Sequence, residues 1–259
     1  MRARARTSRP FRLLPMIVFD PDTDALFLDL DGTLIDIALR PDDVYAPDSL
    51  IFALEALYRR MGGALAIVSG RSIAAVDTLL SPLRLPAAGV HGAEIRIEPR
   101  GHIRHGAPLL PTAVRWLLAP LLNIPGVLIE DKGVAIAVHY RQAPESAEVI
   151  RDVVMAAVRA NSAEGLTVIP GKFVFEIKHA NLSKGTAVAE FMAHAPWARR
   201  RPVFIGDDVT DEAGFAVLPR WSGLGLSVGQ PRPGAVIGFQ TADEVRTWLT
   251  QLVQQECTT

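Results

Sequence analysis

The chain of 259 residues contains a single cysteine, Cys257, which excludes an internal disulfide and is typical of a reducing compartment. Long hydrophobic runs are also missing, because charged residues interrupt every apolar stretch before the ~20 residues that a membrane-spanning helix needs. The formal net charge is -1, which leaves no overall positive field to attract nucleic acid or acidic lipid. These absences predict a cytoplasmic protein with neither a membrane nor a nucleic-acid partner.

Charge is nevertheless uneven at the N-terminus, where MRARARTSRPFR carries five arginines and no acidic residue. Such a segment can be a transit peptide or a nucleic-acid-binding arm, whereas the apolar stretch after it is too short for a secretory signal. Polar termini are more commonly disordered. We therefore expect residues 1–19 to form a disordered, arginine-rich tail.

Apolar runs of strand length alternate with amphipathic helical stretches in the first and last thirds of the chain. This rhythm predicts a parallel sheet covered by helices on both faces, as in Rossmann-like α/β folds. The predicted strands include residues 25–30, 64–69, 203–207 and 225–228. The predicted helices are residues 49–61, 73–80, 184–194, 211–218 and 242–255.

The middle of the chain has a different pattern, with hairpins and helices instead of βαβ units. Hairpins are predicted around Pro99-Arg100-Gly101, Asp131-Lys132-Gly133 and Pro170-Gly171, and helices at residues 111–122 and 145–161. This pattern indicates a compact α+β module inserted in the larger fold. We therefore predict an α/β protein with a core at 20–97 and 179–259 and an α+β cap at 98–178.

The segment DPDTDALFLDLDGTLID, residues 20–36, holds six aspartates. Asp20, Asp22 and Asp24 have the alternate spacing of an EF-hand loop, but that loop needs glycine at its sixth position, where Ala25 stands. The loop would also have to contain the apolar strand ALFLDL. We therefore reject a calcium site and expect these three carboxylates to be solvated on the approach to the strand.

Asp29 and Asp31 end the same apolar strand, where Gly32-Thr33 turn the chain. Alternate residues share one face of a strand, and ligands of parallel α/β sheets bind beyond the carboxyl ends of the strands. Two carboxylates at such a place cost stability unless a cation or strong donors bind them. An ordinary surface turn is therefore a poor explanation for this pair.

GDDVTDE, residues 206–212, is a second acidic group at the end of an apolar strand. By itself it would indicate an acidic turn that caps a helix, but two such groups facing one cleft make a hard oxygen site suited to Mg²⁺. Between the two groups, Ser69 follows a third strand and Lys184 begins a helix, so a hydroxyl and a cation are available to a phosphate. Each residue alone is weak evidence, whereas their order along the chain is informative.

These motifs, in this order, resemble those of the haloacid dehalogenase (HAD) superfamily of aspartate-nucleophile phosphatases, whose larger caps are inserted at the corresponding place. The resemblance implies that Asp29 attacks phosphorus and that Asp31 protonates the leaving oxygen and then activates water. Ser69 and Lys184 would bind the transferring phosphoryl group. The resemblance also implies a Mg²⁺ ion bound by Asp29, the backbone carbonyl of Asp31 and Asp207, with Asp208 and Asp211 as further candidates.

Other segments are similar to the trehalose-6-phosphate phosphatases in particular, namely GVHGAE (89–94), EDKG (130–133), HYR (139–141) and PGKFVFEIK (170–178). The resemblance implies that trehalose 6-phosphate is the substrate, with functional coupling to a trehalose-phosphate synthase. It implies that cap residues grip the distal glucose through charge-assisted hydrogen bonds, namely Glu130, Lys132 and Glu176. Further implied substrate-binding residues are Arg71 and His91, with Glu94, Arg141 and Lys172 as weaker candidates.

Alternatives remain open at this point. Another sugar phosphate, such as sucrose phosphate or a glycosyl-phosphoglycerate, would be hydrolysed by the same reaction. Asp131-Lys132-Gly133 can be a simple hairpin turn with Glu130 and Lys132 solvated beside it, and His91 can brace the junction of core and cap. A non-catalytic sugar-phosphate sensor with this fold is a further alternative, although both motif aspartates, the serine and the lysine are present.

Overall fold

Two β-sheets organise the part of the chain that the computed structural model describes, residues 18–37 and 44–254. The larger sheet has eight strands in the order β12-β11-β10-β1-β2-β3-β4-β5, and the smaller has four in the order β6-β7-β9-β8. The arginine-rich tail was predicted at residues 1–19. Of these, residues 1–17 lie outside the described part of the chain, and Val18 and Phe19 are described. Phe19 packs edge-on against Trp248, with the ring centroids 5.3 Å apart.

The large sheet is mainly parallel. From β12 to β3 all neighbouring strands run in the same direction, whereas β4 and β5 are antiparallel additions at one edge. Its strands are β1 (Asp24–Leu28), β2 (Leu65–Val68), β3 (Ala87–Gly89), β4 (Glu94–Arg96), β5 (Arg104–His105), β10 (Arg201–Gly206), β11 (Leu224–Val228) and β12 (Val236–Phe239).

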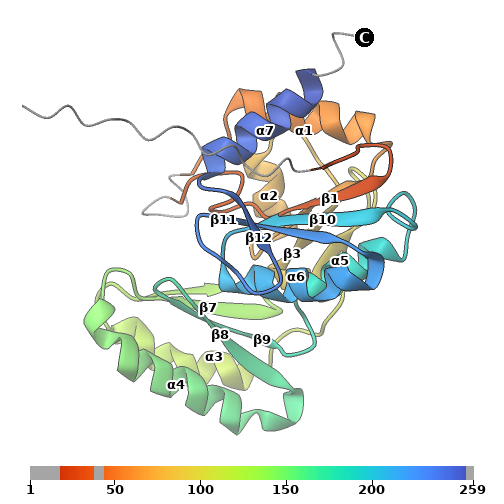
Figure 1. Ribbon diagram of the computed structural model, residues 1–259. Helices are drawn as coiled ribbons and strands as arrows, with labels where there is room; N and C mark the ends of the chain where they lie inside the picture. Colours follow the sequence, from red (N-terminus) through yellow and green to blue (C-terminus); the bar gives the residue numbers. More distant parts are fainter. Residues whose placement is uncertain (1–17, 38–43, 255–259) are drawn as a thin grey trace, which may run out of the picture.

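Helices cover both faces of the large sheet (Figure 1). One face carries α1 (Asp48–Arg60), α2 (Ile73–Leu79) and α7 (Ala242–Gln254), and the other carries α5 (Lys184–Met192) and α6 (Glu212–Val217). Because β1 lies between β10 and β2 and both of its faces are covered, all five of its residues are buried. This explains why DALFL is mostly apolar without alternation.

The small sheet is antiparallel throughout and has an apolar cluster of its own. It consists of β6 (Leu128–Asp131), β7 (Ala135–His139), β8 (Leu166–Gly171) and β9 (Val174–His179). On the side away from the large sheet it is covered by α3 (Thr112–Leu118) and α4 (Ala147–Ala160), as Figure 1 shows. We call these four strands and two helices the cap, and the large sheet with its five helices the core.

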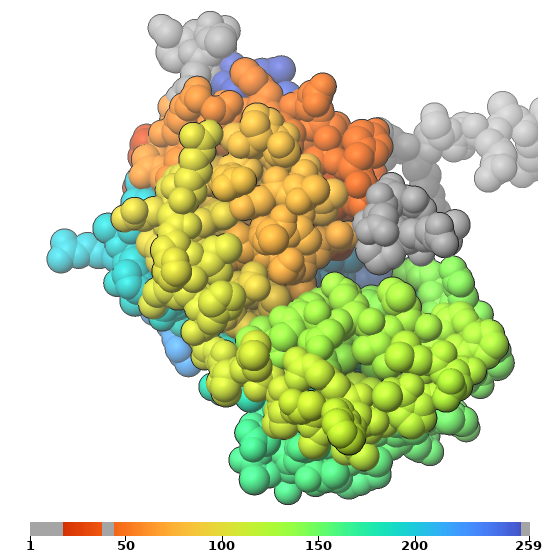
Figure 2. Space-filling model, turned by 180° about the vertical axis from the view of Figure 1, so that it is seen from behind, coloured from red at the N-terminus to blue at the C-terminus, as the bar shows by residue number. Residues whose placement is uncertain are grey.

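Seen from behind, the cap residues form a green lobe that abuts the yellow and orange residues of the core (Figure 2). The predicted α/β fold class, with a Rossmann-like parallel sheet and an inserted α+β unit, is confirmed by the sheet order and topology. The predicted boundaries of the cap stay a prediction; β5 lies within 98–178 but pairs with β4 in the large sheet. Among the described residues, no helix is long and apolar enough to cross a bilayer.

One predicted turn is wrong. The strand β8 continues through Pro170 and Gly171, and the chain turns at residues 172–173, where Phe173 has a φ of 62°. Proline is tolerated in β8 because this strand is at the edge of the small sheet, where a missing N–H breaks no inner ladder. The strand β12, at the edge of the large sheet, was not predicted.

The expected solvation of the first three aspartates is wrong for Asp24. Its side chain is buried at the start of β1, and its two carboxylate oxygens accept N–H groups of Arg201, each at 2.7 Å. Asp20 accepts the backbone N–H of Asp22 at 2.9 Å, as in an ordinary turn. The sequence spacing could not show this pairing, because Arg201 is 177 residues further along the chain.

Candidate active site

Residues predicted to be catalytic or to bind metal meet at the carboxyl ends of three adjacent strands. The strands β10, β1 and β2 are neighbours in the large sheet, and the first residues after them are Asp207, Asp29 and Ser69. Lys184 reaches the same place as the first residue of α5, where the Ser183 side chain accepts the backbone N–H of Thr186 at 3.0 Å. The parallel topology therefore gathers residues that are far apart in the sequence.

Lys184 is the charged centre of the site. Its Nζ donates to Oδ1 of Asp29 at 2.6 Å and to Oδ1 of Asp211 at 2.7 Å, and all three side chains are buried. Burial alone would lower the pKa of Lys184, but Asp211 and Asp29 raise it well above its usual value. Lys184 is therefore a fixed cation.

Asp29 is buried and held by two donors. Besides Lys184, the hydroxyl of Thr33 donates to its Oδ2 at 3.2 Å. Burial raises the pKa of Asp29 well above its usual value, although Lys184 opposes this shift. The neighbouring carboxylates of Asp211 and Asp207 raise the pKa of Asp29 further.

The segment after β10 folds around Asp211. Oδ2 of Asp211 accepts the backbone N–H groups of Asp207 and Asp208, each at 3.0 Å. Oδ1 of Asp208 instead accepts the backbone N–H and the hydroxyl of Thr210, at 2.6 and 2.7 Å. The Asp208 carboxylate therefore caps its own turn, whereas the Asp211 carboxylate faces Lys184.

The carboxylates of Asp29, Asp207 and Asp211 fit a hard divalent cation. One oxygen from each lies within 4.8 Å of the others, and Oδ1 of Asp207 is buried without a hydrogen-bond partner among the described residues. Burial and the nearby Asp211 raise the pKa of Asp207 to about 7. Gly32 makes the close approach possible, since a Cβ there would lie 2.2 Å from Oδ2 of Asp207. Three carboxylates face one ammonium, and an oxygen-binding cation would offset the excess charge.

The Asp31 side chain is not part of this cluster and has a partner of its own. Its carboxylate accepts two N–H groups of Arg71, each at 2.7 Å. Ser69 is buried, and its Oγ accepts the backbone N–H of Arg71 at 3.1 Å. Of the residues predicted to bind metal, Asp29 and Asp207 thus lie in the cluster, and the side chains of Asp31 and Asp208 have other partners.

The cap contributes a second charged network at its junction with the core. Nζ of Lys132 donates to Oε1 of Glu176 at 3.0 Å and to the carbonyl of Gly70 at 3.1 Å. Oε2 of Glu176 lies 2.8 Å from Nε2 of His91. Burial alone would raise the pKa of Glu176, but Lys132 and His91 outweigh it and hold that pKa well below its usual range. Three predicted substrate-binding residues are therefore in one network that joins cap to core.

The remaining predicted residues lie around this network. Oε2 of Glu130 lies 3.0 Å from Nε2 of His139, and the hydrogen bond between them lowers the pKa of Glu130. Glu94 accepts the backbone N–H of Ile73 at 2.7 Å and so fixes the start of α2. Arg141 lies over the ring of Phe173, 5.6 Å from its centroid, and Lys172 is an exposed residue of the turn after β8.

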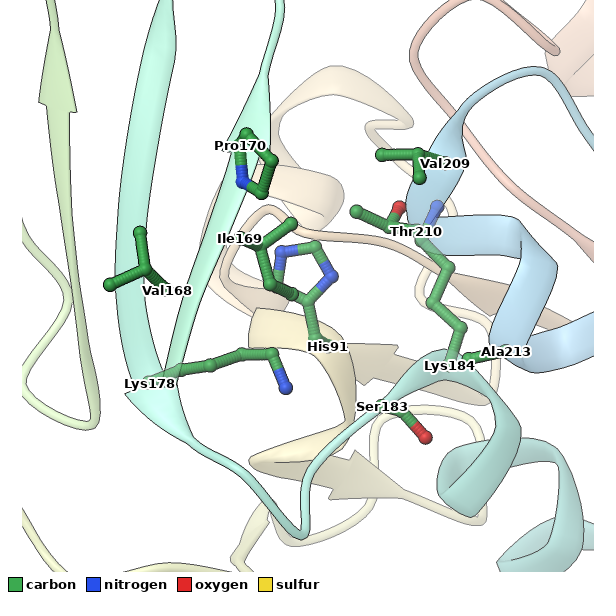
Figure 3. A pocket seen from close by; sticks show the side chains of 10 residues that line it. All are labelled: His91, Val168, Ile169, Pro170, Lys178, Ser183, Lys184, Val209, Thr210 and Ala213. Atoms are coloured by element: carbon green, nitrogen blue, oxygen red, sulfur yellow. The ribbon is translucent and has the colours of Figure 1, made fainter. Parts of the chain in front are cut away.

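A cavity of about 220 Å³ lies between the cap strands β8 and β9 and the core (Figure 3). It adjoins the acidic cluster through Lys184. The lining residues come from both units, namely His91, Val168, Ile169, Pro170, Lys178, Ser183, Lys184, Val209, Thr210 and Ala213. A ligand there would contact cap and core together.

Lys178, which lines this cavity, was not among the predicted site residues. The side chain is buried at the end of β9. A signal was available, because the two-residue period of a strand places Lys178 on the same face as Glu176. Thr33 was also missed, although it follows the motif aspartates directly.

Comparison with known proteins assigns this arrangement to a family. The family model for trehalose-phosphatase matches residues 27–232. The chain belongs to the trehalose-phosphatase family. Members of this family are phosphoric monoester hydrolases, and residues 27–232 include every site residue discussed above.

Two relatives from this family are similar over most of their length. A probable trehalose-phosphate phosphatase from Sinorhizobium fredii is 43% identical over 218 residues, which are 83% of this chain and 82% of that protein. A trehalose-6-phosphate phosphatase from Escherichia coli is 41% identical over 234 residues, which are 88% of this chain and 86% of that protein. The alignments therefore extend through both the core and the cap.

Solved structures share the fold of this trehalose-phosphatase family member. The C-terminal domain of a Candida albicans trehalose-6-phosphate phosphatase superposes with a TM-score of 0.79 at 20% identity, covering 90% of this chain and 92% of that one. A Bacteroides thetaiotaomicron phosphatase of the HAD superfamily gives a TM-score of 0.54 at 16% identity, covering 94% and 97%. At these identities the likeness concerns the fold alone, which is that of HAD phosphatases.

Proposed function

We propose that this trehalose-phosphatase family member is a Mg²⁺-dependent enzyme that hydrolyses trehalose 6-phosphate to trehalose and phosphate through an aspartyl-phosphate intermediate. The observation that carries the proposal is the buried Asp29 carboxylate, 2.6 Å from the Lys184 ammonium at the end of β1. The names of the two relatives at 41% and 43% identity support the substrate. Cytoplasmic location and coupling to a synthase stay predictions.

In the first step, a carboxylate oxygen of Asp29 forms a bond to phosphorus while the bond between phosphorus and the sugar oxygen breaks. Asp31 gives its proton to that oxygen, and the sugar leaves as an alcohol. Lys184 stabilises the negative charge on the phosphoryl oxygens, and Ser69 donates its hydroxyl to one of them. The hydroxyl of Thr33, 3.2 Å from Oδ2, keeps the Asp29 carboxylate in its orientation.

In the second step, a water oxygen attacks the phosphorus of the aspartyl-phosphate and the bond from phosphorus to Asp29 breaks. Asp31 takes the proton that the water loses, so phosphate leaves and both aspartates return to their first state. For this role Asp31 has to leave Arg71, to which it is bonded at 2.7 Å. A phosphate can bind the same two N–H groups of Arg71 and so release Asp31.

A Mg²⁺ ion bound among Asp29, Asp207 and Asp211 would neutralise charge so that an anionic carboxylate can approach an anionic phosphate. The unpartnered Oδ1 of Asp207 supports this position. We expect the backbone carbonyl of Asp31 to face the ion as well, as the superfamily resemblance implies.

The cap residues Glu130, Lys132 and Glu176 would bind the sugar hydroxyls. In the described arrangement Lys132 and Glu176 bond to each other and to the core. A sugar that enters the junction would exchange some of these bonds for bonds to its hydroxyls, which charged groups bind strongly. Substrate binding and cap position would then be coupled.

The proposal is tested by phosphate release from trehalose 6-phosphate, with Mg²⁺ and with a chelator. Sucrose 6-phosphate, a glucosyl-phosphoglycerate and glucose 6-phosphate serve as competing substrates. We expect release only with the divalent cation and fastest from trehalose 6-phosphate. Faster release from another sugar phosphate would refute the assignment of trehalose 6-phosphate as the substrate. Release that is insensitive to the chelator would refute the dependence on a metal ion.

A further inference from the structure

The turn that connects β11 to β12 carries an arginine that the proposed mechanism does not use. Its sequence is PRPG, residues 231–234, so Arg232 lies between two prolines. Proline fixes its own φ and restricts the residue before it to extended backbone. Gly234 has a φ of 80°, and the backbone N–H of Ala235 donates to the carbonyl of Arg232 at 3.1 Å. The turn is therefore a stiff support for the Arg232 side chain.

This turn packs on α6, the helix that follows the acidic segment after β10. A Cβ at Gly234 would lie 3.1 Å from the Cβ of Phe215, so the turn and the helix are in close contact. From the turn, the Arg232 guanidinium reaches back to two residues of the acidic segment. Its Nε donates to the backbone carbonyl of Asp207 at 2.9 Å, and its Nη1 lies 3.5 Å from Oε1 of Glu212.

The bond to the Asp207 carbonyl bears on the direction of the Asp207 side chain. Because peptide units are planar, the orientations of the two units that flank a Cα determine the φ and ψ of that residue. Asp211 accepts the N–H of each of these two units, at 3.0 Å. Those bonds close the acidic segment on itself, whereas the bond from Arg232 fastens it to a turn that lies 25 residues further along the chain.

The Asp207 carboxylate depends on such support more than its neighbours do. Asp29 and Asp211 both accept a hydrogen bond from Lys184. Oδ1 of Asp207, in contrast, is buried without a hydrogen-bond partner among the described residues. The place of this oxygen is therefore set by the backbone of Asp207 and by the close approach of Gly32.

We propose that Arg232 is a positioning residue of the metal site, which holds the backbone carbonyl of Asp207 and thereby keeps the Asp207 carboxylate in place for a divalent cation. This inference rests on the proposed function, because it requires that the acidic cluster bind Mg²⁺. Two other roles for Arg232 predict different results. As a positive charge alone, Arg232 would repel the cation, so its removal would strengthen Mg²⁺ binding. As a brace of the turn alone, its removal would lower stability and leave Mg²⁺ binding unchanged.

The measurement is the thermal midpoint of the chelator-treated, full-length protein as Mg²⁺ is added. A ligand stabilises the folded protein according to the ratio of its concentration to its Kd. Each variant is compared with its own midpoint without Mg²⁺, which separates metal binding from a loss of stability. Arg232→Met removes the donors, and we expect it to need about tenfold more Mg²⁺ than the wild type for the same rise. Arg232→Lys keeps a donor and the charge, and should lie between the two.

Arg200→Met is the matched control. Nη1 of Arg200 also donates to backbone carbonyls, those of Pro21 at 2.9 Å and of Asp24 at 3.1 Å, but at the amino end of β1, away from the cluster. The control should lower the midpoint without Mg²⁺ and need the wild-type concentration of Mg²⁺ for the same rise. If Arg232→Met needs no more Mg²⁺ than the control, Arg232 is a brace or acts by its charge, and the proposal is overturned.

The two proposals fail in different ways. If Mg²⁺ neither raises the wild-type midpoint nor activates phosphate release, the metal dependence of the proposed function fails, and the role of Arg232 fails with it. If Mg²⁺ does both, and Arg232→Met and Arg232→Lys keep the wild-type requirement for Mg²⁺, the proposed function stands and the role of Arg232 alone is refuted. A higher requirement in Arg232→Met, restored in part by Arg232→Lys and absent from the control, supports both.

Discussion

The acidic cluster in the core and the charged network at the junction of core and cap differ in their balance of charge. In the core, Lys184 pairs with two of three clustered carboxylates, and Oδ1 of the third, Asp207, has no partner among the described residues. At the junction, Lys132 and Glu176 offset each other, and each oxygen of Glu176 has a partner. An unbalanced buried site favours the uptake of a cation or a proton, whereas a balanced one can join two units without a ligand.

The largest expected effect is at the nucleophile. Asp29→Asn replaces the attacking carboxylate with an amide of the same shape, so turnover of trehalose 6-phosphate should fall at least ~10³-fold. The fold should persist, since the change removes one of three clustered negative charges. Phosphate release and the thermal midpoint measure the two effects.

Asp22→Asn is the control for that variant, because Asp22 is exposed and close by in the sequence. The control should keep wild-type turnover. If Asp29→Asn retains a tenth of the activity or more, Asp29 is not the nucleophile.

The next effect distinguishes the two aspartates after β10. Asp207 lies in the cluster, whereas the Asp208 carboxylate is occupied by Thr210. Asp207→Asn should weaken activation by Mg²⁺ at least ~100-fold, and Asp208→Asn much less. A titration of Mg²⁺ into chelator-treated protein, followed by activity and by the thermal midpoint, checks this. Equal effects of the two variants would contradict the assignment.

At the junction the expected effect is on stability. Glu176→Gln removes the charge that Lys132 and His91 share, and should destabilise the protein by about 1.5–3 kcal/mol at pH 7. The pKa of Glu176 is lower in the folded than in the unfolded chain, whose value is near 4.5. The charge therefore stabilises the fold above that pH, and this contribution is lost as the pH falls below it.

The stability difference between wild type and Glu176→Gln should accordingly be constant between pH 5 and 7 and shrink from pH 4.5 downward. Denaturant unfolding at several pH values measures it. Glu164→Gln, an exposed change in the cap, is the control and should give no such dependence. A difference that grows on acidification would show that Glu176 is not ionised in the folded protein.

The smallest expected effect is at Glu130, whose side chain is 47% exposed. The pair with His139 at 3.0 Å is partly exposed to solvent, so Glu130→Gln should change stability by less than ~0.5 kcal/mol. If Glu130 binds the sugar, KM for trehalose 6-phosphate should still rise. A change in stability without a change in KM would show that Glu130 stabilises the fold and does not bind the sugar.

Sequence reasoning succeeded where a motif is local. Asp29, Ser69 and Asp207 each follow an apolar strand, and the topology of parallel sheets then requires them to meet. Reasoning failed at Asp24, whose partner Arg201 is remote in the sequence, and at Pro170, whose place depends on β8 being an edge strand. Lys178 was overlooked although the two-residue period of the strand places it on the same face as Glu176.

By itself, the sequence determined the fold class, because periodicity depends only on neighbouring residues, and it determined the family through motifs that resemble those of known phosphatases. Only the tertiary structure decided which partner each carboxylate of those motifs has. It pairs Asp31 with Arg71, turns Asp208 onto Thr210, and places Asp211 against Lys184. Partners in hydrogen bonds and ion pairs are set by distances of a few ångströms between remote segments, and no spacing along the chain contains that information.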